Sequence, residues 1–355
     1  MQGIVAPKIH LESVTRCALC QSAESDAIFK AVKDYLCGIP GSFRYVQCRN
    51  CKLVYQEPRP VAESLIDCYV DYHTHETEEL PSSFSGPWQG PNRWVRGGIL
   101  AAKYGYRHLA PSNVEAVAAN ILDLLPPVRS RARCGLGSGK GSGLPVFRGN
   151  GRALDIGTGG GIYAATLARL GWSMTCVEFD EVTAANTARR LNLNVFAGSV
   201  EQANFESNSF DFISMFHVIE HLPDPVATLR ECYRILDTGA RIMVRTPNFD
   251  SLVRRLFGRF WRGIEAPRHL FLFSADSLRR AVELAGFQVA GVCTTGAATP
   301  YYLRMSREAR SGAGEHHDNL LLAGIQDRVL NLVVRTGSRF GVLLGDSLHL
   351  EAVKP

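Results

Sequence analysis

The stretch LDIGTGGG, residues 154–161, joins a short apolar run to a helical pattern. Its glycines let the backbone turn sharply and approach a ligand closely. We therefore expect a strand, a tight turn and a helix, with a ligand bound on the turn. Alone, the turn leaves dinucleotide binding open, because Gly159, Gly161 and Ala164 match the G-x-G-x-x-A form of that fingerprint.

Two features around the turn favour a ligand with an amino-acid moiety over a dinucleotide. Asp155 lies two residues before Gly157, where a carboxylate suits a cationic amino group better than a pyrophosphate. If the dinucleotide fingerprint is instead started at Gly157, its last position falls on Ile162, where the fingerprint requires glycine or alanine. Glu178 ends the next apolar run, about 20 residues on, where a carboxylate accepts hydrogen bonds from ribose hydroxyls. The alternative for Glu178 is a solvated glutamate at a strand end.

After residue 151 strand-like apolar runs alternate with amphipathic helical segments, which is typical of a parallel sheet built from βαβ units. The expected strands are Ala153–Ile156, Met174–Glu178, Asn194–Ala197, Phe210–Phe216, Arg241–Thr246, Gln288–Cys293 and Ser347–Val353, and the expected helices are Ile162–Leu170, Thr183–Leu191, Pro225–Leu236, Ala275–Ala285 and Asp318–Val334. This pattern predicts an α/β, Rossmann-like fold with a seven-stranded, mostly parallel sheet.

Several motifs in this order resemble class I S-adenosylmethionine-dependent methyltransferases over roughly residues 151–297. They are LDIGTGGG, VEFD at 177–180, AGSVEQANFESNSFDFISMFHVIEHLPDP at 197–225, ILDTGARIMVRTPN at 235–248 and PRHLFLFSADSLRRAVELAGF at 267–287. The resemblance implies that S-adenosylmethionine binds Asp155, Gly157, Gly159, Gly161 and Glu178. It also implies that residues 198–201, with Ser199 and Val200, flank the adenine, and that Phe216 and His217 lie beside the cofactor.

A second cluster of candidate residues, His217, Glu220 and His221, follows the fourth expected strand, at the sheet edge where open α/β folds bind ligands. Histidine near neutral pH can remove a proton from a methyl acceptor, and Glu220 could orient such a base. In the alternative, His221 caps or packs on the next helix and Glu220 binds backbone amides. A metal held by His217 and His221 is disfavoured, because no third ligand is evident.

The cysteines include two matched pairs, Cys17-x-x-Cys20 and Cys48-x-x-Cys51, in a short β-prone region. Such knuckles place four thiolates around a tetrahedral zinc ion. The alternative is a relict unit in which the cysteines are buried without metal. We expect zinc, because all four ligands are present in a unit too small to fold on its own core.

A four-cysteine unit joined to this fold resembles bacterial deoxysugar C-methyltransferases and related small-molecule methyltransferases. That resemblance implicates Glu220 and His221 in catalysis and, as weaker matches, Tyr69 and Tyr72 in contacts with the acceptor. The chain departs from the pattern in a Gly-, Pro- and Arg-rich segment at 126–150 and in a long helical segment before its last strand.

We expect four regions along the chain. They are a zinc-ribbon-like unit at 14–58, a helical connector on the acceptor side at 59–125, a flexible linker at 126–150 and the S-adenosylmethionine-binding domain at 151–355.

The charge of +5 is too small for this length to predict a nucleic-acid partner. No apolar run reaches the ~20 residues of a membrane span, and residues 1–10 lack signal-peptide features, so we expect a cytoplasmic protein. Residues 251–262 predict an amphipathic helix with four arginines. Three interpretations are open for it: a surface helix over a core stripe, a wall for a phosphate-bearing acceptor with Arg268 and His269 nearby, or association with a membrane surface.

The sequence thus predicts methyl transfer from S-adenosylmethionine to a small-molecule acceptor, such as a sugar nucleotide or another precursor of polysaccharides or secondary metabolites. Two alternatives remain open. One is an NAD(P)-dependent oxidoreductase, which the glycine spacing, Asp155 and the EHLPDP turn oppose. The other is a non-catalytic zinc-binding interaction protein, for which we would expect a degraded cofactor turn.

Overall fold

The computed structural model describes residues 9–69, 97–98, 100–101, 104–109, 144–312 and 320–355. Backbone contacts divide the chain into two compact units. Unit 1 consists of Met1–His73, Met215–Tyr233 and Met243–Val353, and unit 2 of Thr74–Ser214, Arg234–Ile242 and Lys354–Pro355. These units do not follow the four regions expected from the sequence, which remain a prediction.

The main sheet has seven strands in the order β12-β13-β10-β9-β6-β7-β8 and is mostly parallel. Its strands are β6 (Arg152–Ile156), β7 (Ser173–Glu178), β8 (Asn194–Ala197), β9 (Phe210–Phe216), β10 (Leu236–Pro247), β12 (Gln288–Thr295) and β13 (Ser347–Val353). β7 pairs in parallel with β6 and β8, and β12 pairs antiparallel with β13. The predicted Rossmann-like fold is therefore confirmed.

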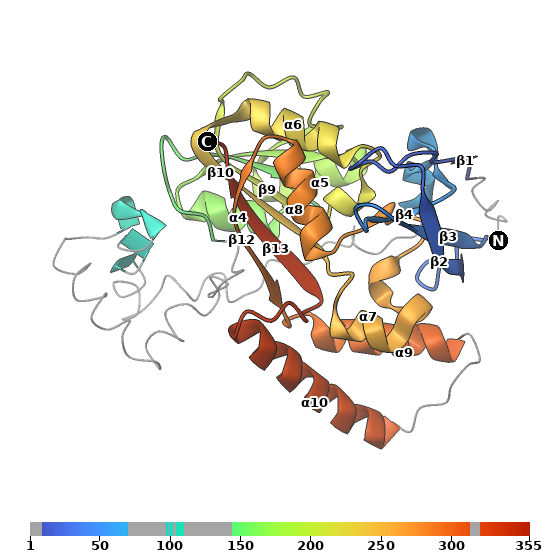
Figure 1. Ribbon diagram of the computed structural model, residues 1–355. Coiled ribbons are helices and arrows are strands. Elements are labelled where there is room, and N and C mark those ends of the chain that lie inside the picture. The colour runs from blue at the N-terminus through green and yellow to red at the C-terminus, as the bar shows by residue number, and fades with distance from the viewer. Residues whose placement is uncertain (1–8, 70–96, 99, 102–103, 110–143, 313–319) are drawn as a thin grey trace, which may run out of the picture. The chain divides into compact units, whose positions relative to one another are not determined.

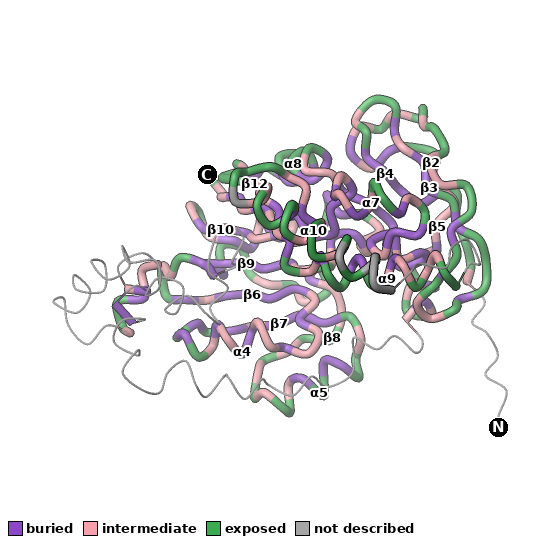
Figure 2. The backbone as a smooth tube through the Cα atoms, turned by 90° about the horizontal axis from the view of Figure 1, so that it is seen from below, coloured by how far each residue is buried: buried purple, intermediate pink, exposed green. Residues whose placement is uncertain are grey.

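The strands and helices of this sheet follow the local sequence signals closely. Four of the five residues of β6 are buried, as expected for a strand covered on both faces (Figure 2). Helix α5 (Glu181–Leu191) begins where the Asp180 side chain accepts a hydrogen bond from Thr183 N at 2.6 Å, and ends at Asn192, whose φ is 52°. Helices α4 (Ile162–Arg169), α6 (Pro225–Ile235) and α8 (Ala275–Leu284) also lie within two residues of their predicted bounds.

Strand β10 differs from the prediction, because it begins at Leu236 and not at Arg241. The intervening Asp-Thr-Gly looks like a turn in the sequence. Pairing with the chain end overrides that signal, since Gly239 N donates to Lys354 O at 2.7 Å and Lys354 N donates to Ala240 O at 3.0 Å.

Unit 1 also contains a four-stranded antiparallel sheet in the order β11-β4-β3-β2, of which β4, β3 and β2 are labelled in Figure 1. Its strands are β2 (Ser25–Val32), β3 (Phe43–Cys48), β4 (Val54–Gln56) and β11 (Phe271–Leu272). The sequence predicted the β-rich character of the first three. It did not predict β11, which comes from more than 200 residues later in the chain and ties the N-terminal strands to the segment around His269.

Residues 251–262 do not form the single amphipathic helix that we expected. Helix α7 (Leu252–Phe257) ends at Gly258, whose φ of 53° favours glycine, and short 3₁₀ turns follow at Gly258–Phe260 and Arg262–Ile264. Phe257, Phe260 and Trp261 are buried in the core of unit 1. This arrangement agrees with the interpretation of a core stripe beneath a charged surface.

Several helices differ from the prediction. Residues 61–69 form two short 3₁₀ helices, Ala62–Ser64 and Ile66–Tyr69, where we expected part of a helical connector. Helix α9 (Thr299–Gly312) was not predicted, and α10 (Leu320–Arg339) extends past its predicted end. Tyr72 and residues 126–143 of the expected linker lie outside the described residues. Of the helices that the structure describes, none is long and apolar enough to cross a membrane.

A buried ion pair joins the N-terminal strands of unit 1 to the segment before β11. Arg268 Nη2 lies 2.7 Å from Asp34 Oδ1, Arg268 Nη1 lies 2.9 Å from Asp34 Oδ2, and both side chains are at most 1% exposed. The Asp34 carboxylate also accepts hydrogen bonds from the backbone N–H groups of Leu36, Cys37 and Ile39. Asp34 thus orders its own loop and holds Arg268.

We expect Asp34→Ala to lower the free energy of unfolding by about 3–5 kcal/mol, because it removes the carboxylate that binds both terminal nitrogens of a buried guanidinium. Urea denaturation measures this change. The matched control is Asp26→Ala, which removes an exposed partner of Arg49 and should leave stability nearly unchanged. Equal effects of the two substitutions would contradict the role given to the buried pair.

Candidate functional site

The glycine turn between β6 and α4 has the backbone that its sequence predicts. Gly157, Gly159 and Gly161 have φ values of 68°, 51° and 72°, which favour glycine over residues with a side chain. A Cβ on Gly161 would lie 2.6 Å from atoms of Thr187 and Leu191, so this glycine lets α5 pack against the turn. A Cβ on Gly159 would meet no atom of the described residues within 4 Å. The turn therefore has open space at Gly159.

Two buried carboxylates brace this turn. Asp155 accepts hydrogen bonds from Thr158 Oγ1 at 2.9 Å and Ser214 Oγ at 2.6 Å. Glu178 accepts from Gly159 N at 2.8 Å and Asp180 N at 3.2 Å. Carboxylates at these positions suit a cationic amino group and ribose hydroxyls. The residues fit the amino-acid and ribose groups of S-adenosylmethionine.

The remaining cofactor candidates flank the sheet edge. Ser199 N donates to Gln202 Oε1 at 2.8 Å, and Val200 is 2% exposed. The guanidinium of Arg245 lies 4.0 Å from the centre of the Phe216 ring. Their contacts with a cofactor remain a prediction.

His221, at the end of the 3₁₀ turn η6 (Ile219–His221), is held by Tyr69 and Arg268. Its Nδ1 lies 2.8 Å from Tyr69 Oη and 3.0 Å from Arg268 O. Because a carbonyl oxygen only accepts, Nδ1 carries the proton and Nε2 keeps its lone pair. The structure thus brings Tyr69 to His221 and leaves Nε2 of His221 as the basic atom.

Glu220 differs from the role expected for it. Its side chain is 1% exposed, and neither oxygen accepts a hydrogen bond from a residue that the structure describes. Oε1 lies 3.4 Å from His217 Nδ1. Burial opposes ionisation, yet His217 first, then His221 and His269, lower the pKa of Glu220 to about 2. Glu220 therefore supplies a buried negative charge among histidines, and main-chain and tyrosine groups orient His221.

His217 occupies the left-handed backbone region, with a φ of 57°, and its N–H donates to Arg245 O at 2.9 Å. Non-glycine residues in this conformation are often found at functional sites. Its side chain is half exposed, so it lies at the surface end of this cluster.

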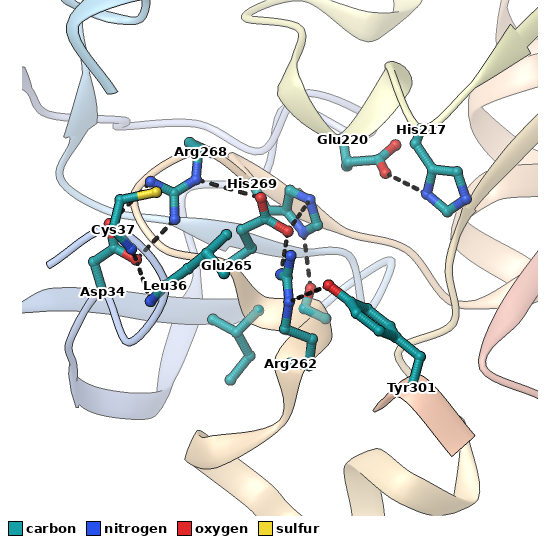
Figure 3. A network of polar contacts seen from close by, with 12 residues as sticks. Asp34, Leu36, Cys37, His217, Glu220, Arg262, Glu265, Arg268, His269 and Tyr301 are labelled. Carbon is teal, nitrogen blue, oxygen red and sulfur yellow. Dashed lines mark hydrogen bonds and ion pairs between the residues drawn. The ribbon is translucent and has the colours of Figure 1, made fainter. Parts of the chain in front are cut away.

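The sequence did not predict the ionic network that surrounds this cluster (Figure 3). Glu265 forms ion pairs with Arg262 and with Arg268. The distance from Arg268 Nε to Glu265 Oε1 is 3.3 Å. Asp34 holds the other side of Arg268, and Arg268 Nη1 also donates to Cys68 O at 3.0 Å, next to Tyr69. The sequence had marked Arg268 and His269 as neighbours of a pocket, but nothing in the local pattern marked Asp34 or Glu265.

The four predicted metal-ligating cysteines come together. Cys17 Sγ lies 3.4 Å from Cys51 Sγ, Cys20 Sγ lies 3.5 Å from Cys48 Sγ, and all four sulfurs are within 4.8 Å of one another. Thiolates at about 2.3 Å from a tetrahedral zinc ion would lie roughly 3.8 Å apart. The cluster therefore has the dimensions of a zinc site.

The two knuckles also share one backbone geometry. Gln21 N donates to Cys17 O at 2.9 Å, and Lys52 N donates to Cys48 O at 3.1 Å. Gln21 and Lys52, the fourth residue after the first cysteine of each pair, have φ values of 60° and 62°. The equivalence of the turns indicates two halves of one site.

Comparison with known proteins decides the family. The sequence pattern described as "Methyltransferase domain" matches residues 110–292, which is just over half of the chain. The chain belongs to this methyltransferase family. It is 34% identical to a ubiquinone biosynthesis O-methyltransferase of Xanthomonas oryzae pv. oryzae over 103 residues, which are 27% of this chain and 43% of the relative. It is 37% identical to the protein of that name from Caulobacter sp. (strain K31) over 114 residues, 30% of this chain and 45% of the relative.

The chain thus spans less than half the length of these curated relatives. Among solved structures, a phosphoethanolamine N-methyltransferase 2 of Haemonchus contortus in complex with S-adenosyl-L-methionine matches with a TM-score of 0.43 and 17% identity, covering 93% of this chain and 69% of that one. A SAM-dependent methyltransferase of Archaeoglobus fulgidus matches with a TM-score of 0.41 and 20% identity. This match covers 59% of this chain and 88% of that one.

His269 gives this methyltransferase a testable pH dependence. Burial lowers the pKa of His269 to about 4, although Glu265 opposes the shift. Between the unfolded pKa of about 6.5 and 4, the unfolded chain binds a proton that the folded chain does not, so stability falls as the pH falls. Over this window the loss from His269 is on the order of 3 kcal/mol. His269→Gln should flatten the dependence in denaturation curves, whereas exposed His10→Gln should follow the wild type. Superimposable wild-type and His269→Gln profiles would contradict this assignment.

Proposed function

We propose that this S-adenosylmethionine-dependent methyltransferase methylates a small-molecule acceptor, with His221 as the residue that removes the acceptor's proton. The observation that carries the proposal is the arrangement around His221: Nδ1 donates to Arg268 O, and Nε2 retains a lone pair. The partial exposure of His221 is consistent with access for an acceptor.

The cofactor site of the proposal comprises Asp155, Gly157, Gly159, Gly161 and Glu178, with Ser199, Val200, Phe216 and His217 as further contacts. S-adenosylmethionine, when bound, supplies a methyl group on a sulfonium. Asp155 would bind its amino group and Glu178 its ribose hydroxyls, because both carboxylates lie at the glycine turn and suit these groups. The open space at Gly159 is consistent with this placement.

At the acceptor, the protein's own part is to position the substrate and move one proton. Nε2 of His221 would take the proton of a hydroxyl or an acidic C–H group while Nδ1 keeps its own. The buried charge of Glu220 would stabilise the resulting imidazolium. Tyr69, held at 2.8 Å from His221, would contact the acceptor and fix the imidazole ring.

The acceptor is a sugar nucleotide or another precursor of polysaccharides or secondary metabolites in this proposal. The resemblance of the cysteine unit to deoxysugar C-methyltransferases supports it, whereas the curated relatives are named ubiquinone O-methyltransferases. Arg262 and Arg268 are paired with Glu265 and Asp34, so a phosphate group of the acceptor would bind away from these two arginines.

We expect His221→Ala to slow methyl transfer by about 10²–10⁴-fold while binding the cofactor and melting nearly as the wild type. The loss falls on chemistry because the residue is a base. A screen of sugar nucleotides and quinol precursors supplies the acceptor, and kcat is then measured. His217→Ala, on the same segment, should be milder. Full turnover of His221→Ala would refute the assignment.

We also infer that Cys17, Cys20, Cys48 and Cys51 bind one zinc ion that stabilises residues 14–58. The support is the spacing of the sulfurs and the matched turns described above.

Protein purified without chelator should carry one zinc per chain, and Cys48→Ser should lower that content and expose the N-terminal strands to proteolysis, because metal binding and folding are coupled. Elemental analysis measures the zinc. Cys232→Ser, a buried cysteine outside the cluster, is the control. Zinc-free wild-type protein that resists proteolysis would contradict the inference.

A further inference from the structure

A second group of possible metal ligands lies in unit 1, away from the cysteines in sequence. Glu220, His221 and His269 each offer one ligand atom, and the three atoms lie within 4.8 Å of one another. Glu220 and His221 are in η6, and His269 precedes β11. The hydrogen bond from Leu270 N to Glu220 O, 2.8 Å long, holds the two segments together.

The carboxylate of this group lacks the partners that a buried charge normally has. The Glu220 side chain is 1% exposed, and within the described residues neither oxygen accepts a hydrogen bond. Its nearest basic group is His217, 3.4 Å away and half exposed. Buried carboxylates in proteins are paired or coordinate a metal.

The surrounding charges do not compensate Glu220. Arg262 and Arg268 balance Glu265 and Asp34, with which they form ion pairs (Figure 3). The negative charge of Glu220 is not balanced by these two arginines. A second carboxylate is near, because Glu265 Oε2 lies 3.5 Å from His269 Nε2. A cation placed among Glu220, His221 and His269 would meet negative charge on both sides.

Both histidines are set up as nitrogen ligands. His221 Nδ1 lies 3.0 Å from Arg268 O, and His269 Nδ1 lies 2.8 Å from Gly263 O. Each carbonyl fixes the proton on Nδ1 and leaves the lone pair on Nε2. Metal-binding histidines almost always have this arrangement, in which the other ring nitrogen donates to a carboxylate, a carbonyl or water.

The geometry points to a second metal site, formed by Glu220, His221 and His269, that takes a divalent transition-metal ion such as Zn²⁺ or Co²⁺. Two imidazoles and one carboxylate suit these ions, whereas Mg²⁺ and Ca²⁺ prefer oxygen ligands. Ligands about 2.0–2.1 Å from a tetrahedral ion lie roughly 3.4 Å apart, so the side chains move inward by about 1 Å on binding. Water fills the fourth position.

The site bears on methyl transfer through His221. An ion bound to His221 Nε2 occupies the lone pair that takes the acceptor's proton, so the ion inhibits the reaction. This inhibition rests on the function proposed above. Binding of the ion is independent of that function, because the ion needs neither cofactor nor acceptor to bind.

The test is calorimetric titration of the full chain with CoCl₂ after the cysteine site has been filled with zinc. The wild type should bind one further ion per chain. The visible absorption spectrum of the bound cobalt should lack the strong charge-transfer bands of cobalt–thiolate bonds. His269→Gln should weaken this binding by more than about tenfold, because it removes one of three ligands. His217→Gln, on the same segment but outside the set, should bind as the wild type.

Folded wild-type protein that takes up no further ion would overturn the site, whatever the variants do. Loss of binding in His217→Gln but not in His269→Gln would overturn the ligand set. In a methyl-transfer assay the added ion should inhibit, and activation by the ion would overturn the inhibitory role.

Discussion

Arg268 ties together three segments of unit 1. Its guanidinium binds Asp34 and the carbonyl of Cys68, and its own carbonyl accepts from His221. Burial opposes the charge, but Asp34 and Glu265 raise the pKa of Arg268 above its ordinary range. Since Cys68 precedes Tyr69, Arg268 fixes the backbone beside Tyr69 through its side chain and the ring of His221 through its main-chain carbonyl.

The cofactor turn in unit 2 rests on a different constraint. Asp155 and Glu178 hold the glycine turn in shape by accepting hydrogen bonds from Thr158 and Gly159. The carboxylates proposed to bind the ligand therefore also hold the turn in shape.

The fold could largely be predicted from the sequence because its signals are local. β8, β9 and β13 have their predicted bounds, since each is an uninterrupted apolar or alternating run. The start of β10 and the existence of β11 were not predicted, because pairing with segments distant in sequence stabilises them. Gly258 divided the helix expected at residues 251–262, where the arginine pattern had outweighed a single glycine.

The candidate site could be predicted only in part, for the same reason. His221 and the cysteines stand in recognisable motifs. Asp34, Glu265 and His269 have their roles only because tertiary packing brings residues more than 200 positions apart into one network. Glu220 was expected to orient His221, but Nδ1 of His221 bonds to Tyr69 Oη and Arg268 O, and the Glu220 carboxylate lies 3.4 Å from His217 Nδ1.

The most direct test of the central claim is calorimetric titration of the full chain with S-adenosylmethionine and, separately, with NAD(P). The account predicts binding of one S-adenosylmethionine per chain, weakened in both Asp155→Asn and Glu178→Ala by about 1.5–3 kcal/mol, as for hydrogen bonds to charged groups. It predicts no binding of the nicotinamide cofactors. Binding of a nicotinamide cofactor in place of S-adenosylmethionine, or unchanged S-adenosylmethionine affinity in both variants, would contradict it.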